Sequence, residues 1–114
     1  MMIEPTLISS HAMDSGIALD LYLDPDLLWF RGHFPQLPLL PGVVQLDWAL
    51  LLAGRHLGLT AQYTDRFQVK YKAGLFPGDH VTLVLRHDVA KGRLGFDYRR
   101  DGVTCSNGSL VVGP

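Results

Sequence analysis

Alternating apolar and polar residues predict β-strands along most of this chain. In GIALDLYL, residues 16–23, every second residue from Ile17 to Leu23 is apolar, which is the pattern of a half-buried strand. The same alternation recurs in the second half of the chain, where turn residues separate the runs. Further strands are predicted at residues 66–73, 80–89, 94–100 and 103–112, and residues 7–11 are expected to form an edge strand or a loop.

One segment in the middle of the chain breaks this alternation. From Val43 to Ala53 only Gln45 and Asp47 are polar. Apolar residues at nearly every position indicate burial on all sides, and the leucine and alanine content favours helix over strand. A Pro-Gly pair precedes the segment and Gly58 follows it, which suits a helix start and stop. We therefore predict one buried helix over residues 42–57.

These elements predict an α+β fold in which a curved antiparallel sheet wraps around one long helix. Asp101-Gly102 is a strong hairpin signal, and Lys91-Gly92 is a second candidate turn. The 114 residues are expected to form one domain, spanning residues 1–114. Apolar residues make up 47% of the chain, so a domain this small is expected to bury part of its surface in an oligomer.

Composition excludes several classes of protein. A net charge of -1 does not suggest general nucleic-acid binding. We expect neither a signal peptide nor a membrane-spanning helix, because residues 1–114 contain no basic-led hydrophobic N-terminus and no apolar run of 18 residues. Cys105 is the one cysteine, so we expect a buried hydrophobe in the reducing cytoplasm. The histidines other than His33 lack the spacing of metal ligands, and no metal or organic cofactor is expected.

Charge is unevenly distributed along the chain. Residues 1–30 carry acidic side chains and no Lys or Arg, whereas residues 66–100 carry eight basic side chains and three acidic ones. The basic residues are interpreted either as ordinary solvated strand faces or as a docking surface for an acidic carrier protein or a phosphate.

Two ionisable residues stand out as candidates for chemistry. Asp47 would lose hydration in an apolar helix, so it is either a hydrogen-bonded structural residue or a partly neutral carboxyl that acts as a general acid. His33 sits in a Gly-His-Phe-Pro turn and could act as a base, although a lone loop histidine is more often structural. The free amides of Gly42 and Val43 at the helix start would face a ligand.

The residues around His33 and Asp47 resemble the active-site signature of the 3-hydroxyacyl-[acyl-carrier-protein] dehydratases of the FabZ/FabA type. The matching residues are Gly32-His33-Phe34-Pro35, Pro38, Pro41-Gly42-Val43 and Leu46-Asp47, followed by Arg66-Phe67 and Phe76-Pro77-Gly78-Asp79. Two features depart from the family pattern. Leu51 replaces a usual glutamine, and the acid is Asp, as in the isomerising FabA type. The short chain points to the aryl-polyene-pathway (ApeI-like) subtype.

The resemblance implies a hot-dog fold and the dehydration of a 3-hydroxyacyl thioester to a trans-2-enoyl thioester. It implies that His33 and Asp47 are catalytic, and that Gly42 and Val43 bind the thioester oxygen. The substrate would be carried on the phosphopantetheine of an acyl carrier protein. The enzyme would be a homodimer, or a heterodimer with another hot-dog subunit, whose sheets join edge to edge.

Three alternatives remain open at this stage. A hot-dog thioesterase would hydrolyse the thioester, although such enzymes usually lack the His33 loop. A non-catalytic hot-dog subunit would support a catalytic mate, and the Leu51 departure keeps that interpretation open. The same site could also hydrate an enoyl thioester in the reverse direction.

Overall fold

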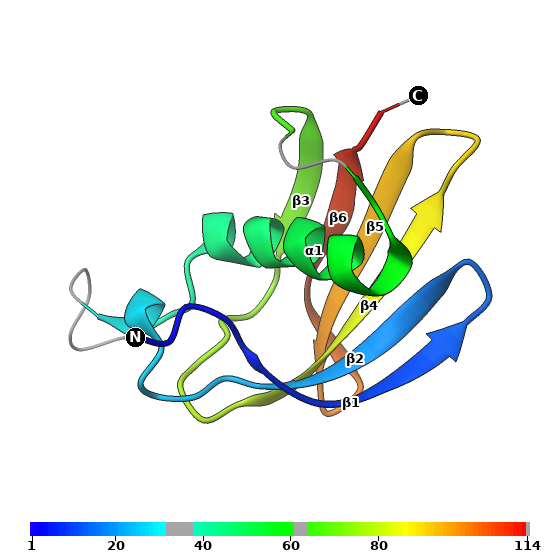
Figure 1. The fold of residues 1–114 in the computed structure, drawn as a ribbon. Helices are drawn as coiled ribbons and strands as arrows, with labels where there is room; N and C mark the ends of the chain where they lie inside the picture. The colour runs from blue at the N-terminus through cyan, green and yellow to red at the C-terminus, as the bar shows by residue number, and fades with distance from the viewer. Residues whose placement is uncertain (32–37, 61–63, 114) are drawn as a thin grey trace.

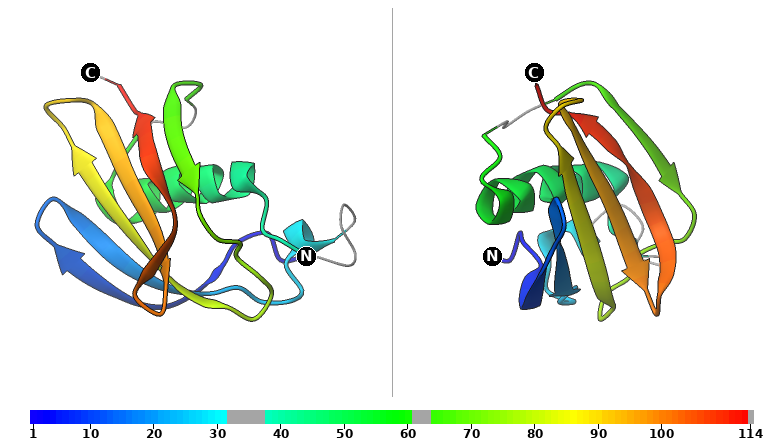
Figure 2. Two further views of the ribbon diagram at one scale, coloured as in Figure 1. Left: turned by 180° about the vertical axis from the view of Figure 1, so that it is seen from behind. Right: turned by 90° about the vertical axis from the view of Figure 1, so that its right-hand side faces the viewer.

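The computed structural model describes residues 1–31, 38–60 and 64–113 (Figure 1). In these ranges six strands form one antiparallel sheet in the order β1-β2-β4-β5-β6-β3. The strands are β1 (Thr6–Met13), β2 (Gly16–Tyr22), β3 (Phe67–Tyr71), β4 (His80–Asp88), β5 (Arg93–Arg100) and β6 (Val103–Val111); the helices are the short 3-10 helix η1 (Leu28–Phe30) and α1 (Gly42–Leu57). The sheet curls around α1 (Figure 2), which confirms the expected α+β architecture.

The turns follow from the local sequence. Asp101 and Gly102 both have positive φ, at 54° and 77°, which is the conformation of the two-residue turn that joins β5 to β6. The predicted bounds of the helix are confirmed, because α1 begins at Gly42 and ends at Leu57. Gly58 then stops the helix in a left-handed conformation with φ 70°.

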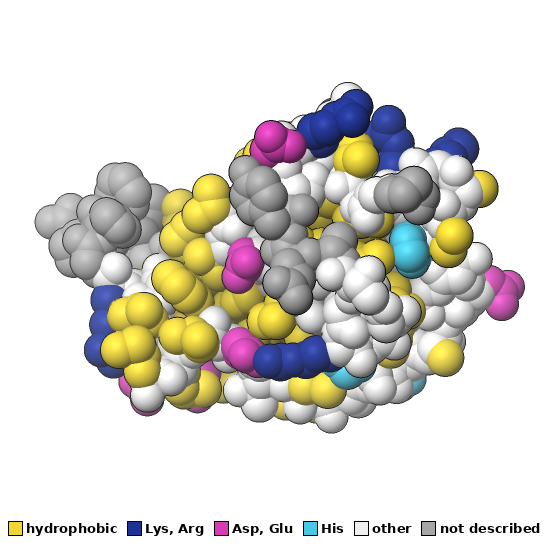
Figure 3. Space-filling view, turned by 45° about the horizontal axis from the view of Figure 1, so that its top comes forward, with side chains coloured by type: hydrophobic (Ala, Val, Ile, Leu, Met, Phe, Trp, Pro, Cys, Tyr) yellow, Lys and Arg dark blue, Asp and Glu magenta, His cyan; other side chains and the backbone are white. Residues whose placement is uncertain are grey.

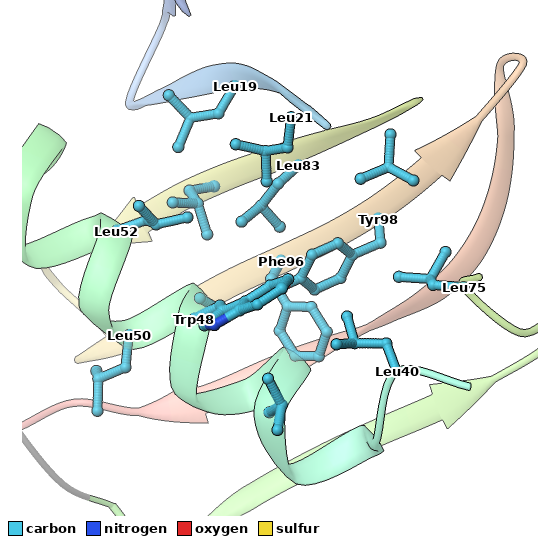
Figure 4. Close-up of a cluster of buried hydrophobic side chains, with 14 of the residues drawn as sticks. Leu19, Leu21, Leu40, Trp48, Leu50, Leu52, Leu75, Leu83, Phe96 and Tyr98 are labelled. Carbon is cyan, nitrogen blue, oxygen red and sulfur yellow. The ribbon is translucent and has the colours of Figure 1, made fainter. Parts of the chain in front are cut away.

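The core lies between α1 and the inner face of the sheet. Trp48 points from α1 toward Phe96 and Tyr98 (Figure 4), and all three side chains are buried. The leucines of β2 and β4 complete the cluster, namely Leu19, Leu21, Leu83 and Leu85. Cys105 is buried among these residues, as expected for a small hydrophobe.

The prediction that α1 is buried on all sides is wrong for this chain alone. Val43 is 74% exposed, and Asp47 and Arg55 are also exposed. The sheet covers only the side of α1 that carries Trp48, and the opposite side has no cover in the described residues. The composition of an apolar helix does not indicate which of its sides the chain's own sheet covers, which explains the error.

Long-range pairing sets the two edges of the sheet. β1 lies at one edge, which confirms the edge-strand interpretation of residues 7–11. β3 lies at the other edge and pairs only with β6 among the described strands. Because β3 is an edge strand, its inward-facing Phe67 and Tyr71 remain 47% and 51% exposed.

Within the described residues, no helix is both long enough and apolar enough to cross a membrane.

The N-terminal segment ties η1 to α1. The backbone carbonyl of Ile3 accepts hydrogen bonds from the indoles of Trp29, at 2.8 Å, and Trp48, at 3.1 Å. Glu4 pairs with Arg55 of α1 through both carboxylate oxygens. Trp29 packs against the core and is only partly buried.

A polar network lies on the outer face of the sheet around Asp20. Its carboxylate accepts hydrogen bonds from Ser9 at 2.6 Å and from Thr82 at 2.9 Å, and His11 lies 3.1 Å away. The bond from Ser9, followed by that from Thr82, lowers the pKa of Asp20 below its ordinary value. These hydroxyls join β1 and β4 to the strand between them.

Candidate active site

At the start of α1, two backbone amides have no hydrogen-bond partner among the residues that the structure describes. The amides of Val44 and Gln45 both donate to the carbonyl of Pro41, at 3.1 and 3.2 Å. The preceding amides, of Gly42 and Val43, come too early in the helix to have a partner within it. These are the two groups that the sequence predicts as donors to a ligand oxygen, and the helix dipole adds to their attraction for negative charge.

Two hydrogen bonds fix the segment that leads into this helix start. The backbone amide of Leu40 donates to the carbonyl of Leu75 at 2.9 Å. Its carbonyl accepts from the side-chain amide of Gln45 at 3.2 Å. Because Leu40 stands two residues before Gly42, these bonds orient the first turn of α1 relative to the sheet.

Gln45 is the centre of a buried polar network that the sequence analysis did not assign to the site. Its side-chain oxygen accepts from the hydroxyl of Ser106 at 2.6 Å, and its backbone carbonyl accepts from Tyr98 at 2.7 Å. Gln45 is 3% exposed, and the other two residues are fully buried. The signal was present in the sequence, since Gln45 is one of only two polar residues in the apolar part of α1.

Burial keeps the Tyr98 phenol protonated, so it acts as a donor in this network. Its pKa is raised well above the ordinary value, first by burial and then by electrostatic interaction with Tyr71 and Asp47. The helix start therefore rests on neutral hydrogen bonds that link α1 to β5 and β6.

The Pro-Gly-Asp turn after β3 supports the same region. Arg100 donates from one nitrogen to the carbonyl of Gly74 and to the carboxylate of Asp79, both at 2.7 Å. Asp79 also accepts from the backbone amide of Phe76 at 2.8 Å. The acid of this motif is therefore a structural group that holds residues 74–79 against β5.

A cavity of about 530 Å³ opens beside the start of α1. Its walls come from three segments that are far apart in the sequence, namely residues 29–31, residues 38–42 with Gln45, and residues 71–74. Most of the lining side chains are apolar or aromatic, and Arg31 and Lys72 supply positive charge. The size and lining suit an acyl chain that ends in a polar group.

Tyr71 is a further residue of this cavity that the sequence analysis did not single out. A Cβ atom at position 42 would collide with the Tyr71 hydroxyl, so that hydroxyl lies directly against Gly42. Burial raises the pKa of Tyr71 above its ordinary value. The glycine at the helix start thus makes room for a phenol, a relation that only the fold reveals.

A second hollow of similar size lies on the outer face of the sheet. Its volume is about 590 Å³, and it lies over Gly95 and Gly108 with a mainly polar rim. Phe96 is the one aromatic residue among its described lining residues, and none of those residues is a predicted site residue. We therefore place the candidate site at the start of α1.

The structure does not bring Asp47 into the cavity at Gly42. Asp47 lies on the uncovered side of α1, in a separate hollow of about 440 Å³ with Leu50, Leu51 and Arg55. Figure 3 shows hydrophobic side chains gathered on the exposed side of α1, with acidic side chains among them. The expectation that Asp47 is shielded from solvent is wrong for the single chain.

His33 lies outside the described residues, so its predicted catalytic role stays a prediction. Of the four predicted site residues, the structure places Gly42 and Val43 at the cavity end of α1 and Asp47 on another side of that helix. Among residues 1–31, 38–60 and 64–113, no three metal-ligating side chains lie close enough to hold an ion.

Sequence comparisons identify related proteins. The chain is 28% identical to the 3-hydroxyacyl-[acyl-carrier-protein] dehydratase FabZ of Sorangium cellulosum, over 94% of this chain and 75% of the relative. It is 35% identical to the FabZ of Clostridium botulinum, over 73% of this chain and 61% of the relative. The match therefore spans less than two thirds of the second enzyme.

Structure and family comparisons agree with this result. A chain of the dehydratase heterocomplex ApeI:P from Xenorhabdus doucetiae superposes with a TM-score of 0.87 and 37% identity, covering 96% of this chain and 97% of that one. This likeness confirms the hot-dog fold. The sequence also matches the ApeI-like family, described as ApeI dehydratase, over residues 9–109. The chain therefore belongs to the ApeI-like dehydratase family.

Proposed function

We propose that the chain is a catalytic subunit that dehydrates a 3-hydroxyacyl thioester to the trans-2-enoyl thioester. The observation that carries this proposal is the apolar cavity at the start of α1, where Gly42 lines a space suited to an acyl chain. Membership of a dehydratase family supports the reaction class. Fatty-acid or polyene biosynthesis is the setting that the relatives suggest.

The proposed chemistry needs one base, one acid and an oxygen-binding site. His33 removes a proton from the carbon next to the thioester carbonyl, and the negative charge moves to the carbonyl oxygen. The amides of Gly42 and Val43 stabilise that oxygen. As the negative charge moves back from the carbonyl oxygen, the C2–C3 double bond forms and the C3–O bond breaks. Asp47 donates the proton with which the hydroxyl leaves as water.

The position of Asp47 supports a site shared between two subunits. Within one chain Asp47 faces away from the cavity at Gly42, on an apolar surface that the sheet does not cover. A second hot-dog subunit packed against this surface would bury it and could bring Asp47 of one subunit to His33 of the other. The heterocomplex from Xenorhabdus doucetiae supports an unlike subunit as one form of this partner.

Positive charge at the cavity supports a phosphopantetheine-bound substrate. Arg31 and Lys72 both line the cavity and are exposed to solvent. They could pair with the phosphate of the carrier arm while the acyl chain lies among the aromatic side chains. An acyl carrier protein, which is acidic, is therefore the proposed donor of the substrate.

A parallel assay of enoyl absorbance and free thiol tests this function on a 3-hydroxyacyl-pantetheine thioester. Enoyl formation by the wild type, with loss in His33→Ala and in Asp47→Asn, would support the proposal. Free thiol without enoyl product would instead indicate a thioesterase. If neither product forms, the chain is a non-catalytic subunit, which is the second candidate because Leu51 departs from the family pattern. The Asp101→Asn variant, at an exposed turn, serves as the matched control.

Mixing the two inactive variants tests the shared site. In a mixed homodimer one site combines the intact His33 of one chain with the intact Asp47 of the other. When equal amounts of the two variants exchange subunits at random, half of the dimers contain one chain of each, and each of these dimers has one intact site out of two. About a quarter of wild-type activity should therefore return. If a dimeric and active wild type gives variants that recover nothing on mixing, the site lies within one chain.

A further inference from the structure

Tyr71 places a hydroxyl at the same end of α1 as the free backbone amides. It lies on the inner side of β3 and pairs in register with Ser106, the residue that binds the Gln45 side chain. Its ring reaches from the edge of the sheet to Gly42, where a side chain would leave no room for it. Tyr71, Gly42 and Gln45 all line the same cavity.

This juxtaposition limits what the hydroxyl can contact in a bound substrate. A ligand oxygen that accepts a hydrogen bond from the Gly42 amide has the Tyr71 hydroxyl within reach, because that hydroxyl lies against the same residue. Asp47 lies in a different hollow and does not compete for the phenol. A phenol is protonated at neutral pH, and burial raises the pKa of Tyr71 further above its ordinary value, so the hydroxyl can donate.

We propose that the Tyr71 hydroxyl donates a hydrogen bond to the thioester carbonyl oxygen of the substrate, alongside the Gly42 amide. This role rests on the proposed dehydratase function and adds a side-chain donor to the backbone donors. Tyr71 keeps its proton throughout, and its bond strengthens as negative charge develops on the oxygen. It is therefore a catalytic residue that stabilises charge without transferring a proton.

Binding of two matched ligands tests this contact without any turnover. Butyryl-pantetheine has the thioester carbonyl but no 3-hydroxyl, and butyl-pantetheine replaces that carbonyl with a methylene group. The wild-type oligomer should bind the thioester more tightly than the thioether. Tyr71→Phe should reduce this preference by about 2- to 10-fold, because one hydrogen bond to the carbonyl is lost. Tyr22→Phe, which removes a hydroxyl that does not line the cavity, should keep the wild-type preference.

Two results would overturn the role of Tyr71. One is a wild type without any preference for the thioester, and the other is a Tyr71→Phe variant that retains the full preference. An equal loss of affinity for both ligands is a case of the second result, since the preference is then retained, and it would show that the phenol only packs against the ligand.

Kinetics provide a second and separable readout. Tyr71→Phe should lower kcat for dehydration by roughly 10- to 100-fold and raise KM by no more than the roughly 2- to 10-fold loss of thioester affinity, because the contact strengthens in the transition state. If the wild type discriminates between the two ligands but forms no enoyl product, the dehydratase function fails and the Tyr71 contact stands. If the wild type forms the product and Tyr71→Phe matches it in both assays, only the Tyr71 proposal fails.

Discussion

Removing the Ser106 hydroxyl should destabilise the protein far more than the loss of one small group suggests. That hydroxyl donates to the side-chain oxygen of Gln45 at 2.6 Å, and both residues are buried. In Ser106→Ala the amide oxygen of Gln45 keeps its buried position but loses its donor. An unsatisfied buried polar group costs about 1–3 kcal/mol, so we expect the free energy of unfolding to fall by about 2 kcal/mol.

Urea unfolding at a fixed protein concentration measures this change, because an oligomer would otherwise shift the midpoint. For a domain of this size, 2 kcal/mol corresponds to a decrease in Tm of roughly 8 °C. Ser109→Ala is the matched control on the same strand, since Ser109 is only partly buried and pairs with Gly95 on the outer face. Its free energy of unfolding should change by less than about 0.5 kcal/mol.

A double-mutant cycle isolates the Ser106–Gln45 bond. Gln45→Leu removes the acceptor, so Ser106→Ala should cost little in that background. We expect a coupling energy of about 1–2 kcal/mol between the two positions. Two strictly additive changes, or a Ser106→Ala variant as stable as Ser109→Ala, would refute the reasoning that the amide oxygen depends on this hydroxyl.

Three further predictions concern the helix start, the Pro-Gly-Asp turn and the outer face of the sheet. Gly42→Ala should displace the Tyr71 ring and lower the rate of dehydration at least about 10-fold, while urea unfolding shows a change below about 1 kcal/mol; an unimpaired rate would contradict the contact. Arg100→Leu should lower the unfolding free energy by about 1.5–3 kcal/mol, since Asp79 loses a charged donor; a change below about 0.5 kcal/mol would argue against it. Hydrogen bonds from two hydroxyls hold the pKa of Asp20 in the folded protein below its pKa in the unfolded chain. The stability that these bonds give the folded protein is therefore complete above the unfolded-state pKa, and it is lost as the pH falls through the lower folded-state pKa. Urea midpoints measured from pH 6 to pH 3 should therefore fall more steeply for the wild type than for Asp20→Asn, and parallel curves would count against this linkage.

Local sequence signals were sufficient for α1 and for the strands β2 to β6. The alternation within each strand and the glycines at the turns act over a few residues, so residues 42–57 and the Asp101–Gly102 hairpin could be assigned without the fold. The order of strands could not be assigned in the same way. β3 follows α1 in the chain but pairs with β6, and no local pattern encodes a partner more than thirty residues away.

The candidate site was only partly accessible to the same reasoning. The family motif points to Gly42 and Asp47, but not to their separation on two sides of α1. Tyr71 was missed because its relation to Gly42 depends on how the edge strand meets the helix. Gln45 was visible as a polar residue in an apolar segment, yet its partner Ser106 lies 61 residues away in the sequence.

The position of α1 in the chain also has a consequence for synthesis. The helix ends at Leu57, but most of the sheet that covers its Trp48 side comes from β4 to β6, which end at Val111. Translation adds about 5–20 residues per second, so roughly 50 further residues take about 3–10 s. During that interval the apolar helix of the nascent chain is not covered by the sheet, and β2 is not yet paired with β4. The speed of elongation after the helix therefore sets how long this surface remains open to chaperones and to other unfinished chains.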